Sequence, residues 1–206
     1  MMVLPRTTQL LFAPTGQYVE AWIVRLTLHM VREHLHRVWW MDVCLKHDFP
    51  EQPIDRHWDW SKMNIEFHGR VLISQKVAII TGDGAVQGAM LVSTEAVDSA
   101  LMHGEQALFV ELLFTAPRNR PALRQDERPY WLGVGTELLT WAAWLSRETG
   151  CGGRLQLEGS PDYITWYKKR GLQSLDLEPT VFEGVEYTPM ELAPERARDL
   201  LRDWSA

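Results

Sequence analysis

The chain has 206 residues and a mass of 23.8 kDa, enough for one well-filled hydrophobic core. Hydrophobic residues make up 46% and charged residues 23%, a globular balance that excludes a disordered or fibrous protein. The formal charge of -6 disfavours a protein whose task is to hold nucleic acid, and it mildly favours a small cationic substrate.

The composition also bears on location and assembly. No apolar run approaches the roughly 18 to 20 residues that span a bilayer, and the first residues lack the pattern of a signal peptide. Cys44 and Cys151 lie far apart and form no CxxC pair. We therefore expect a cytoplasmic protein without membrane association. Most of the ten tryptophans are expected in the core, and such a surplus also favours an aromatic-lined cleft or an oligomer interface such as that of a homodimer.

The first long segment, from Tyr18 to about His47, repeats apolar residues at helical spacing and is predicted to be a helix. Prolines follow it, so residues 1–57 are expected to form an N-terminal helical region with its connector. His29 and His36 share the charged face of this helix. Because no carboxylate-plus-histidine set of zinc type accompanies them, surface histidines are the favoured interpretation and no metal is expected.

From residue 76 onward the pattern becomes that of extended strands. Lys76 to Thr81 and Ala85 to Ser93 flank a glycine-rich turn, so they predict a hairpin. Ala107 to Thr115 is almost continuously apolar. Such a run is typical of a central strand buried on both faces.

The rest of the chain alternates between helix and strand. Expected helices are Gly133 to Thr149, Ser160 to Gly171 and a tail helix after Pro194; expected strands are Arg154 to Glu158, Leu172 to Leu177 and Glu186 to Leu192. Ser160 is expected to cap the second helix and Gly171 to end it. The order predicts an α/β protein with a mixed sheet. We expect one domain over residues 1–206, with a core at 58–193 and a tail helix at 194–206.

The run from Gly133 to Thr136 is the feature that points to chemistry. A glycine-bearing turn at a helix start presents unpaired N–H groups beside the positive end of the helix dipole, where phosphate or pyrophosphate binds. A G-x-G alone equally fits a simple tight turn. The dinucleotide-binding fingerprint is not met, because Leu138 occupies the third glycine position.

Two longer runs narrow the interpretation: Tyr130-Trp131-Leu132-Gly133-Val134-Gly135 and Tyr167-Lys168-Lys169-Arg170-Gly171-Leu172. They resemble the GNAT acyl-CoA N-acyltransferases, in which Q/R-x-x-G-x-G/A opens the cofactor helix and Y-x-x-x-G-F ends the following one. The resemblance covers roughly residues 76–192. Two features depart from the common pattern: Tyr130 replaces the usual Gln or Arg, and the loop at 120–129 is longer. A bacterial subgroup with a proline-asparagine-arginine strand exit matches Pro117, Asn119 and Arg120.

The resemblance implies a GNAT-like fold and acetyl-CoA as co-substrate. That fold is a mixed, mostly antiparallel sheet with a central parallel pair, flanked by helices, here with an added N-terminal helical segment. Tyr167 resembles the tyrosine that protonates the leaving thiolate, and its ordinary pKa near 10 keeps it protonated at neutral pH. The implied cofactor-binding residues are Leu113, Phe114, Thr115, Arg120, Leu132, Gly133, Val134, Gly135, Thr136 and Ser160.

The general base is less defined. Glu111 interrupts an apolar strand at a place where some GNATs carry a catalytic glutamate, and it is the preferred candidate. Glu158 is the rival, and a chain of water molecules would serve as well. Arg118, Arg124 and Arg128 accompany Arg120 and fit either CoA phosphates or a solvated basic loop.

The sequence therefore predicts an N-acetyltransferase that moves an acetyl group from acetyl-CoA to a primary amine of a small molecule or peptide by direct attack. Within the same fold, an acyl-CoA-binding sensor and a toxin-like aminoacyl-tRNA acetyltransferase are alternatives, although the acidic balance disfavours a nucleic-acid partner. From another class, a non-catalytic interaction protein would dock through Trp141 and Trp144 on the outer side of the glycine-loop helix. Trp39, Trp40, Trp58 and Trp60 suggest an aromatic wall for the acceptor, or else core.

Overall fold

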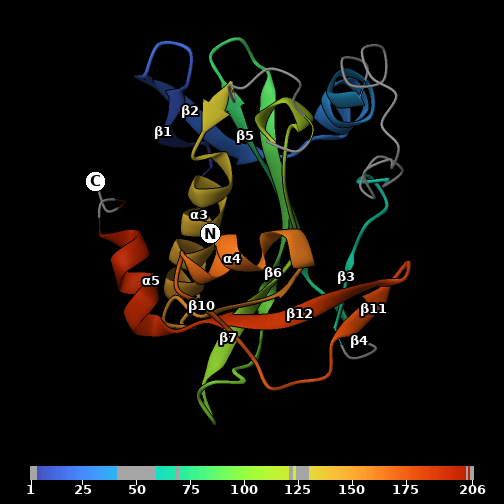
Figure 1. Ribbon diagram of the computed structural model, residues 1–206, viewed down its shortest axis with the longest axis vertical. Coiled ribbons are helices and arrows are strands. Elements are labelled where there is room, and N and C mark those ends of the chain that lie inside the picture. The colour runs from blue at the N-terminus through green and yellow to red at the C-terminus, as the bar shows by residue number, and fades with distance from the viewer. Residues whose placement is uncertain are drawn as a thin grey trace. The chain divides into compact units, whose positions relative to one another are not determined.

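The computed structural model describes residues 4–40, 59–67, 70–120, 123, 130–202 and 204 (Figure 1). The chain divides into two compact units, described in turn below. The first is Met1–Asn64, Lys76–Met90 and Leu113–Leu138, and the second is Ile65–Gln75, Leu91–Leu112 and Leu139–Ala206. The expectation of one domain over the whole chain stays a prediction.

In the first unit, antiparallel strands follow the order β8-β1-β2-β5. Their bounds are Arg6–Phe12 for β1, Gln17–Arg25 for β2, Ser74–Thr81 for β5 and Trp131–Leu132 for β8. β5 is followed across the turn by β6, Val86–Asp98, as the predicted hairpin requires. Asp83 Oδ1 accepts hydrogen bonds from Thr81 Oγ1 at 2.6 Å and from the Ala85 amide at 3.1 Å, which closes that turn.

The helix predicted from Tyr18 is wrong over its first part. Residues up to Arg25 lie in β2, one of the two blue strands of Figure 1, where Ala21 and Ile23 are buried at a spacing of two. β1 and β5 pair with both edges of β2, and this pairing overrides the helical spacing that Val24 shares with later residues. The N-terminal region therefore begins with a β-hairpin, and its helix follows along the chain.

Helical structure begins only after Thr27, whose side chain accepts a hydrogen bond from the Met30 amide at 3.2 Å. Helix α1 is Leu28–Met30, and the π-helix η1, Val31–Val38, continues it. Val31 and Leu35 of the predicted apolar stripe are buried, whereas Leu28 and Val38 of the same stripe are exposed, so the stripe is confirmed only in part. Residues 41–58, which include the rest of the expected helix and Trp58, lie outside the described residues.

In the second unit the strand order is β6-β7-β9-β12-β10. β7 is Gln106–Thr115, β9 is Leu155–Gly159, β10 is Leu172–Ser174 and β12 is Val185–Leu192. β7 and β9 run parallel, and β12 is antiparallel to both β9 and β10. The fold is thus a mixed, mostly antiparallel sheet with a parallel pair, flanked by helices, as predicted.

The core strand of this unit is β7, in which Ala107 to Val110 are all buried, so both of its faces are covered. Two pairings were not predicted. β11, Thr180–Phe182, forms a hairpin with β12, the red arrow of Figure 1. A separate two-stranded sheet joins β3, Ile65–Phe67, to β4, Arg70–Leu72. β10 is also shorter than predicted, ending at Ser174.

Three further helical segments follow the predicted positions. α3 is Val134–Glu148, α4 is Ile164–Lys168 with the 3-10 turn η5, Pro161–Tyr163, before it, and α5 is Pro194–Leu201. Trp141 of α3 is fully buried, so the outward docking surface that the interaction-protein alternative assigned to it is wrong. None of the described helices combines the length and the apolarity needed to cross a membrane.

Candidate functional site

The exit of β7 carries three of the predicted cofactor-binding residues. Leu113, Phe114 and Thr115 are half-buried at the end of that strand. Within the second unit, parallel pairing with β9 runs from Leu108↔Leu155 to Val110↔Leu157, and β7 continues beyond it. Strand backbone of this kind is what the resemblance assigns to the amide groups of pantetheine, by β-type hydrogen bonding.

A polar network then connects the β7 exit to the segment before the glycines. Gln87 is fully buried, and its side-chain oxygen accepts hydrogen bonds from Arg118 Nη2 at 3.1 Å and from Asn119 Nδ2 at 3.2 Å. Asn119 Oδ1 accepts from the Trp131 amide at 3.1 Å. Sequence reasoning did not single out Gln87, although a glutamine inside an apolar strand was the available signal.

The glycine turn lies directly behind this network. Gly133 has φ +89° and a side chain built there would meet no atom within 4 Å. The Gly133 carbonyl oxygen accepts a hydrogen bond from the Glu137 amide at 2.9 Å, so the helical hydrogen bonds start at Gly133. Leu132 is exposed, whereas Val134 is buried and anchors the first turn of α3. The first amides of α3 have no intrahelical partner, and they lie beside open space at Gly133.

Gly88 allows this helix start to approach the sheet. A Cβ on Gly88 would lie 2.6 Å from Val134 Cγ1 and 3.1 Å from the Phe114 carbonyl oxygen. Both distances are shorter than ordinary van der Waals contact. The missing side chain in β6 therefore sets the distance between the strand and the turn that holds Gly133.

The N-terminal hairpin also contacts the segment that leads into the glycine turn. β1 pairs with β8 through Leu11↔Leu132 and Phe12↔Trp131, and the Ala13 amide donates to the Tyr130 carbonyl at 3.2 Å. The Phe12 and Trp131 rings lie 4.8 Å apart. Thr8 Oγ1 donates to Glu137 Oε2 at 2.5 Å and so holds a carboxylate of the first helical turn. These contacts were not predicted, because residues 1–57 were expected to form a helical region.

Arg120 is buried at the exit of β7. It is only 6% exposed, its Nε donates to the Thr115 carbonyl at 2.7 Å, and its guanidinium lies 5.3 Å from the Phe114 ring centroid and 5.9 Å from that of Trp40. These contacts make it a brace of the strand exit. Its contact with CoA phosphates stays a prediction, and Arg124 and Arg128 lie outside the described residues.

The aromatic residues near this exit belong to the core. Trp39, Trp40 and Trp60 are each buried, and Trp60 meets Phe114 edge to face at 6.2 Å. The aromatic wall that the sequence suggested for an acceptor is therefore interior packing at these three positions.

Tyr167 lies in the second unit, on the short helix α4. It is 8% exposed, and in the described part of the chain its hydroxyl has no hydrogen-bond partner. Burial raises the pKa of Tyr167 well above its usual value, and the negative charge that Tyr163 would carry adds to this. The group therefore stays protonated at neutral pH and keeps a donor for a ligand.

Gly159 makes room for Tyr167 and its helix. A Cβ there would lie 2.7 Å from Ile164 Cδ1, 2.9 Å from Met190 Sδ and 3.5 Å from Tyr167 Cδ2. Ser160 follows at the start of η5, but its side chain makes no capping hydrogen bond, so the predicted cap is wrong. Its carbonyl instead accepts the Tyr163 amide at 2.9 Å.

The two candidate bases differ in how they are held. Glu111 is exposed on β7, so the expectation of a costly charge inside the strand does not hold. Glu158 Oε1 accepts a hydrogen bond from Thr180 Oγ1 at 2.5 Å.

Glu111, Ser160 and Tyr167 belong to the second unit, and the other predicted site residues belong to the first. Among the described residues, no group of three His, Cys, Asp or Glu side chains could hold a metal ion.

Comparison with known proteins gives matches among solved structures. No protein-family model matches the sequence. No curated protein matches it either. A spermidine N-acetyltransferase SpeG chimera from Vibrio cholerae and hSSAT is similar with a TM-score of 0.51 at 10% identity, over 87% of this chain and 98% of that chain. A Lactobacillus plantarum protein classed as an N-acetyltransferase gives 0.50 at 12% identity, over 84% and 97%.

Nourseothricin acetyltransferase matches at 24% identity and a TM-score of 0.43, over 58% of this chain and 64% of that enzyme, which is less than two thirds of its length. At these identities the likeness concerns the fold.

Proposed function

We propose that this chain, which has the GNAT fold, is an acyl-CoA N-acyltransferase that transfers an acetyl group to a primary amine. One observation carries the proposal. Gly133 joins β8 to α3 at a positive φ with open space above it, so the first amides of a 15-residue helix are accessible to an anion. The diphosphate of a CoA thioester has the charge and size that such a helix start binds.

The backbone of the β7 exit supports the same substrate. Leu113 to Thr115 are neither fully buried nor fully exposed, as a strand end that pairs with pantetheine amides should be. Gln87, Asn119 and Arg120 hold this exit in place through the hydrogen bonds described above. Their polar groups face backbone and one another, which makes them positioning residues.

The transfer needs an uncharged amine, a leaving thiolate that receives a proton, and a base for the proton that the amine loses. The amine nitrogen forms a bond to the thioester carbonyl carbon, the carbon–sulfur bond breaks, and CoA leaves as thiol. Tyr167 is assigned to the sulfur. Because burial makes a lasting phenolate costly, its hydroxyl gives its proton to the sulfur as the carbon–sulfur bond breaks, and it regains a proton from water before the next turnover.

Glu111 is the proposed acceptor of the amine proton, directly or through water. Its exposure allows the proton to pass to solvent after each turnover. Glu158 is less suited, because Thr180 already donates to its carboxylate. A net charge of -6 supports a cationic amine as the acceptor.

The test is a thiol-release assay of the purified chain with acetyl-CoA and a panel of polyamines, amino acids, small amines and peptides. We expect thiol release that depends on one acceptor class, with an acetylated amine of matching mass. Propionyl-CoA in the same assay measures the tolerance for other acyl groups. Absence of CoA binding by calorimetry together with absence of thiol release would disprove the proposal.

A further inference from the structure

Lys76 lies near the start of β5 in the first unit, and it is half-buried. Its backbone carbonyl accepts a hydrogen bond from the Leu26 amide at 2.9 Å, so the strand fixes the point from which the side chain extends. The side chain reaches the turn at residues 59–62 of the same unit, where Nζ donates to the Ser61 carbonyl at 3.3 Å. The acceptor of this lysine is therefore an uncharged backbone group.

The carboxylate of that turn, on Asp59, is engaged by other donors. Asp59 Oδ1 accepts hydrogen bonds from the Ser61 hydroxyl at 2.5 Å and from the Ser61 amide at 3.1 Å, and Oδ2 pairs with Lys62 Nζ at 3.1 Å. The Ser61 hydroxyl first, and then Lys62, lower the pKa of Asp59 to about 2. Within the part of the chain that the structure describes, no carboxylate lies at ion-pair distance from Lys76.

The surroundings of Lys76 favour the uncharged form of its amine. Burial lowers the pKa of Lys76, and the charge of Asp59 offsets this only in part. A desolvated lysine amine is a better nucleophile at neutral pH than a hydrated one, because more of it is unprotonated. A hydrogen bond donated to a carbonyl leaves the nitrogen lone pair free to attack. Lys62, whose side chain is 84% exposed and pairs with a carboxylate, lacks both features.

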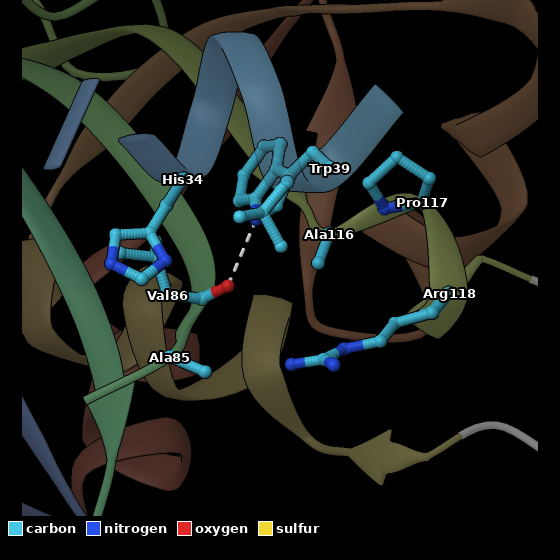
Figure 2. Close-up of a pocket in the computed structure, with 8 residues that line it drawn as sticks. His34, Trp39, Ala85, Val86, Ala116, Pro117 and Arg118 are labelled. Atoms are coloured by element: carbon cyan, nitrogen blue, oxygen red, sulfur yellow. Dashed lines mark hydrogen bonds between the residues drawn. The ribbon is translucent and has the colours of Figure 1, made fainter. Parts of the chain in front are cut away.

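His34 is a second half-buried nitrogen base of this unit, and burial, followed by the charge of His29, lowers its pKa. It lines the hollow between η1 and β6 that Figure 2 shows, which has a volume of about 30 Å³. Such a volume holds about one or two water molecules, so a thioester does not enter it. An acyl group on an imidazole is also lost to water, whereas an amide on a lysine persists. Lys76 is therefore the better site for a lasting modification.

We propose that Lys76 is a site of Nε-acylation by acyl-CoA thioesters from solution. The amine nitrogen forms a bond to the thioester carbonyl carbon, the carbon–sulfur bond breaks, the nitrogen loses a proton to water, and the thiolate takes one from water to leave as CoA thiol. The amide that forms keeps one N–H, which can still donate to the Ser61 carbonyl. The reaction uses none of the glycine-turn residues, so it does not depend on acyl transfer to a separate acceptor.

The experiment is incubation of the folded full chain with acetyl-CoA at mildly alkaline pH. Peptide mass spectrometry follows the acetylated fractions of Lys76 and Lys62 over time, with Lys62 as the matched control in the same turn region. We expect Lys76 to react about 10-fold faster, since the uncharged fraction of an amine rises tenfold for each unit by which its pKa falls. Equal rates at the two lysines, or a faster reaction at Lys62, overturn the proposal.

Two further incubations identify the origin of the preference. In urea-unfolded chain both lysines are hydrated and should react at the same rate, so a preference for Lys76 that survives unfolding contradicts a structural cause. S-acetyl-N-acetylcysteamine is a thioester without the nucleotide, and it should show the same preference for Lys76 in the folded chain. A preference confined to acetyl-CoA would mean that bound CoA delivers the acetyl group, which contradicts reaction from solution. Acyl transfer to free amines is assayed separately, so either proposal can fail alone.

Discussion

The glycine turn and the Tyr167 helix are held by different forces. The turn is held by three polar contacts from two segments: the β1–β8 pairing and the Thr8 bond to Glu137, both from β1, and the Asn119 bond to the Trp131 amide. The Tyr167 helix α4 has five residues, no side-chain cap, and close apolar packing over Gly159. The backbone that is proposed to present amides to an anion is thus held by hydrogen bonds, whereas the side chain that is proposed as the acid is held by burial.

This contrast has a chemical reason. Hydrogen bonds are directional, so they place N–H groups with the precision that diphosphate binding requires. Apolar packing is not directional, but it excludes water and raises the pKa of a phenol. Variants of the glycine turn should therefore lose CoA affinity, whereas variants of the Tyr167 helix should lose turnover or stability.

The largest effect is expected for Tyr167→Phe, which removes only the hydroxyl. Turnover on an established acceptor should fall by about 10²–10⁴, the range of a lost general acid, while CoA affinity stays the same. Steady-state kinetics and calorimetry measure the two. Tyr163→Phe, at an exposed tyrosine of the same segment, is the control and should retain turnover. Full activity of the Tyr167 variant would remove it from the mechanism.

Gly133→Asp should lower CoA affinity by about 100-fold or more, because it places a carboxylate at the helix start and forces a side chain into a positive φ. Gly184→Asp is the matched control, since Gly184 also has a positive φ, at +79°, and open space around it. Calorimetric titration with CoA compares them. If both variants lose the same affinity, the loss reflects backbone strain and the cofactor assignment fails.

Gly159→Ala tests the packed region. Its Cβ would meet Ile164 and Met190 at less than 3.0 Å, so unfolding free energy should fall by about 1–3 kcal/mol, the cost of overpacking. Chemical denaturation measures the loss. Adding Ile164→Val removes the Cδ1 atom at 2.7 Å and should restore part of the stability. No rescue in the double variant would mean that Met190, and not the helix, resists the new methyl group.

Thr8→Val tests the polar region. It removes the donor to the Glu137 carboxylate at nearly constant volume and should cost about 1–2 kcal/mol, with a several-fold loss of CoA affinity. Thr7→Val, at the exposed neighbouring position of β1, serves as the control. Equal stability and CoA affinity in the two variants would show that the N-terminal hairpin does not support the glycine turn.

The smallest change is expected in the pH profile. The rate with a free amine should rise with pH as the amine loses its proton. Because burial holds the pKa of Tyr167 above its usual value, its deprotonation should cause no decline up to about pH 10. Rates of the unaltered chain from about pH 6 to 10 check this. A decline within that range that is absent from Tyr167→Phe would place the pKa lower than burial implies.

Prediction from sequence succeeded where the signal is local. The hairpin around Asp83, the strand Gln106–Thr115 and the helix after Gly133 all follow from turn chemistry and apolar runs of nearby residues. It failed at Tyr18–Arg25, because short apolar stretches fit both helix and strand spacing, and partner strands decide between them. It also missed β8, which has two residues and exists only through its pairing with β1.

The amino-acid sequence by itself indicated the residues that are proposed for the site: the glycines before α3, the lone tyrosine of α4 and the glutamate within β7. Only the tertiary structure decided what holds them. Thr8 and Glu137 are 129 positions apart, and Gln87 meets Asn119 across 32 positions. No local pattern encodes such contacts, because they arise when the chain closes distant strands into one sheet, and the burial that raises the pKa of Tyr167 arises with them.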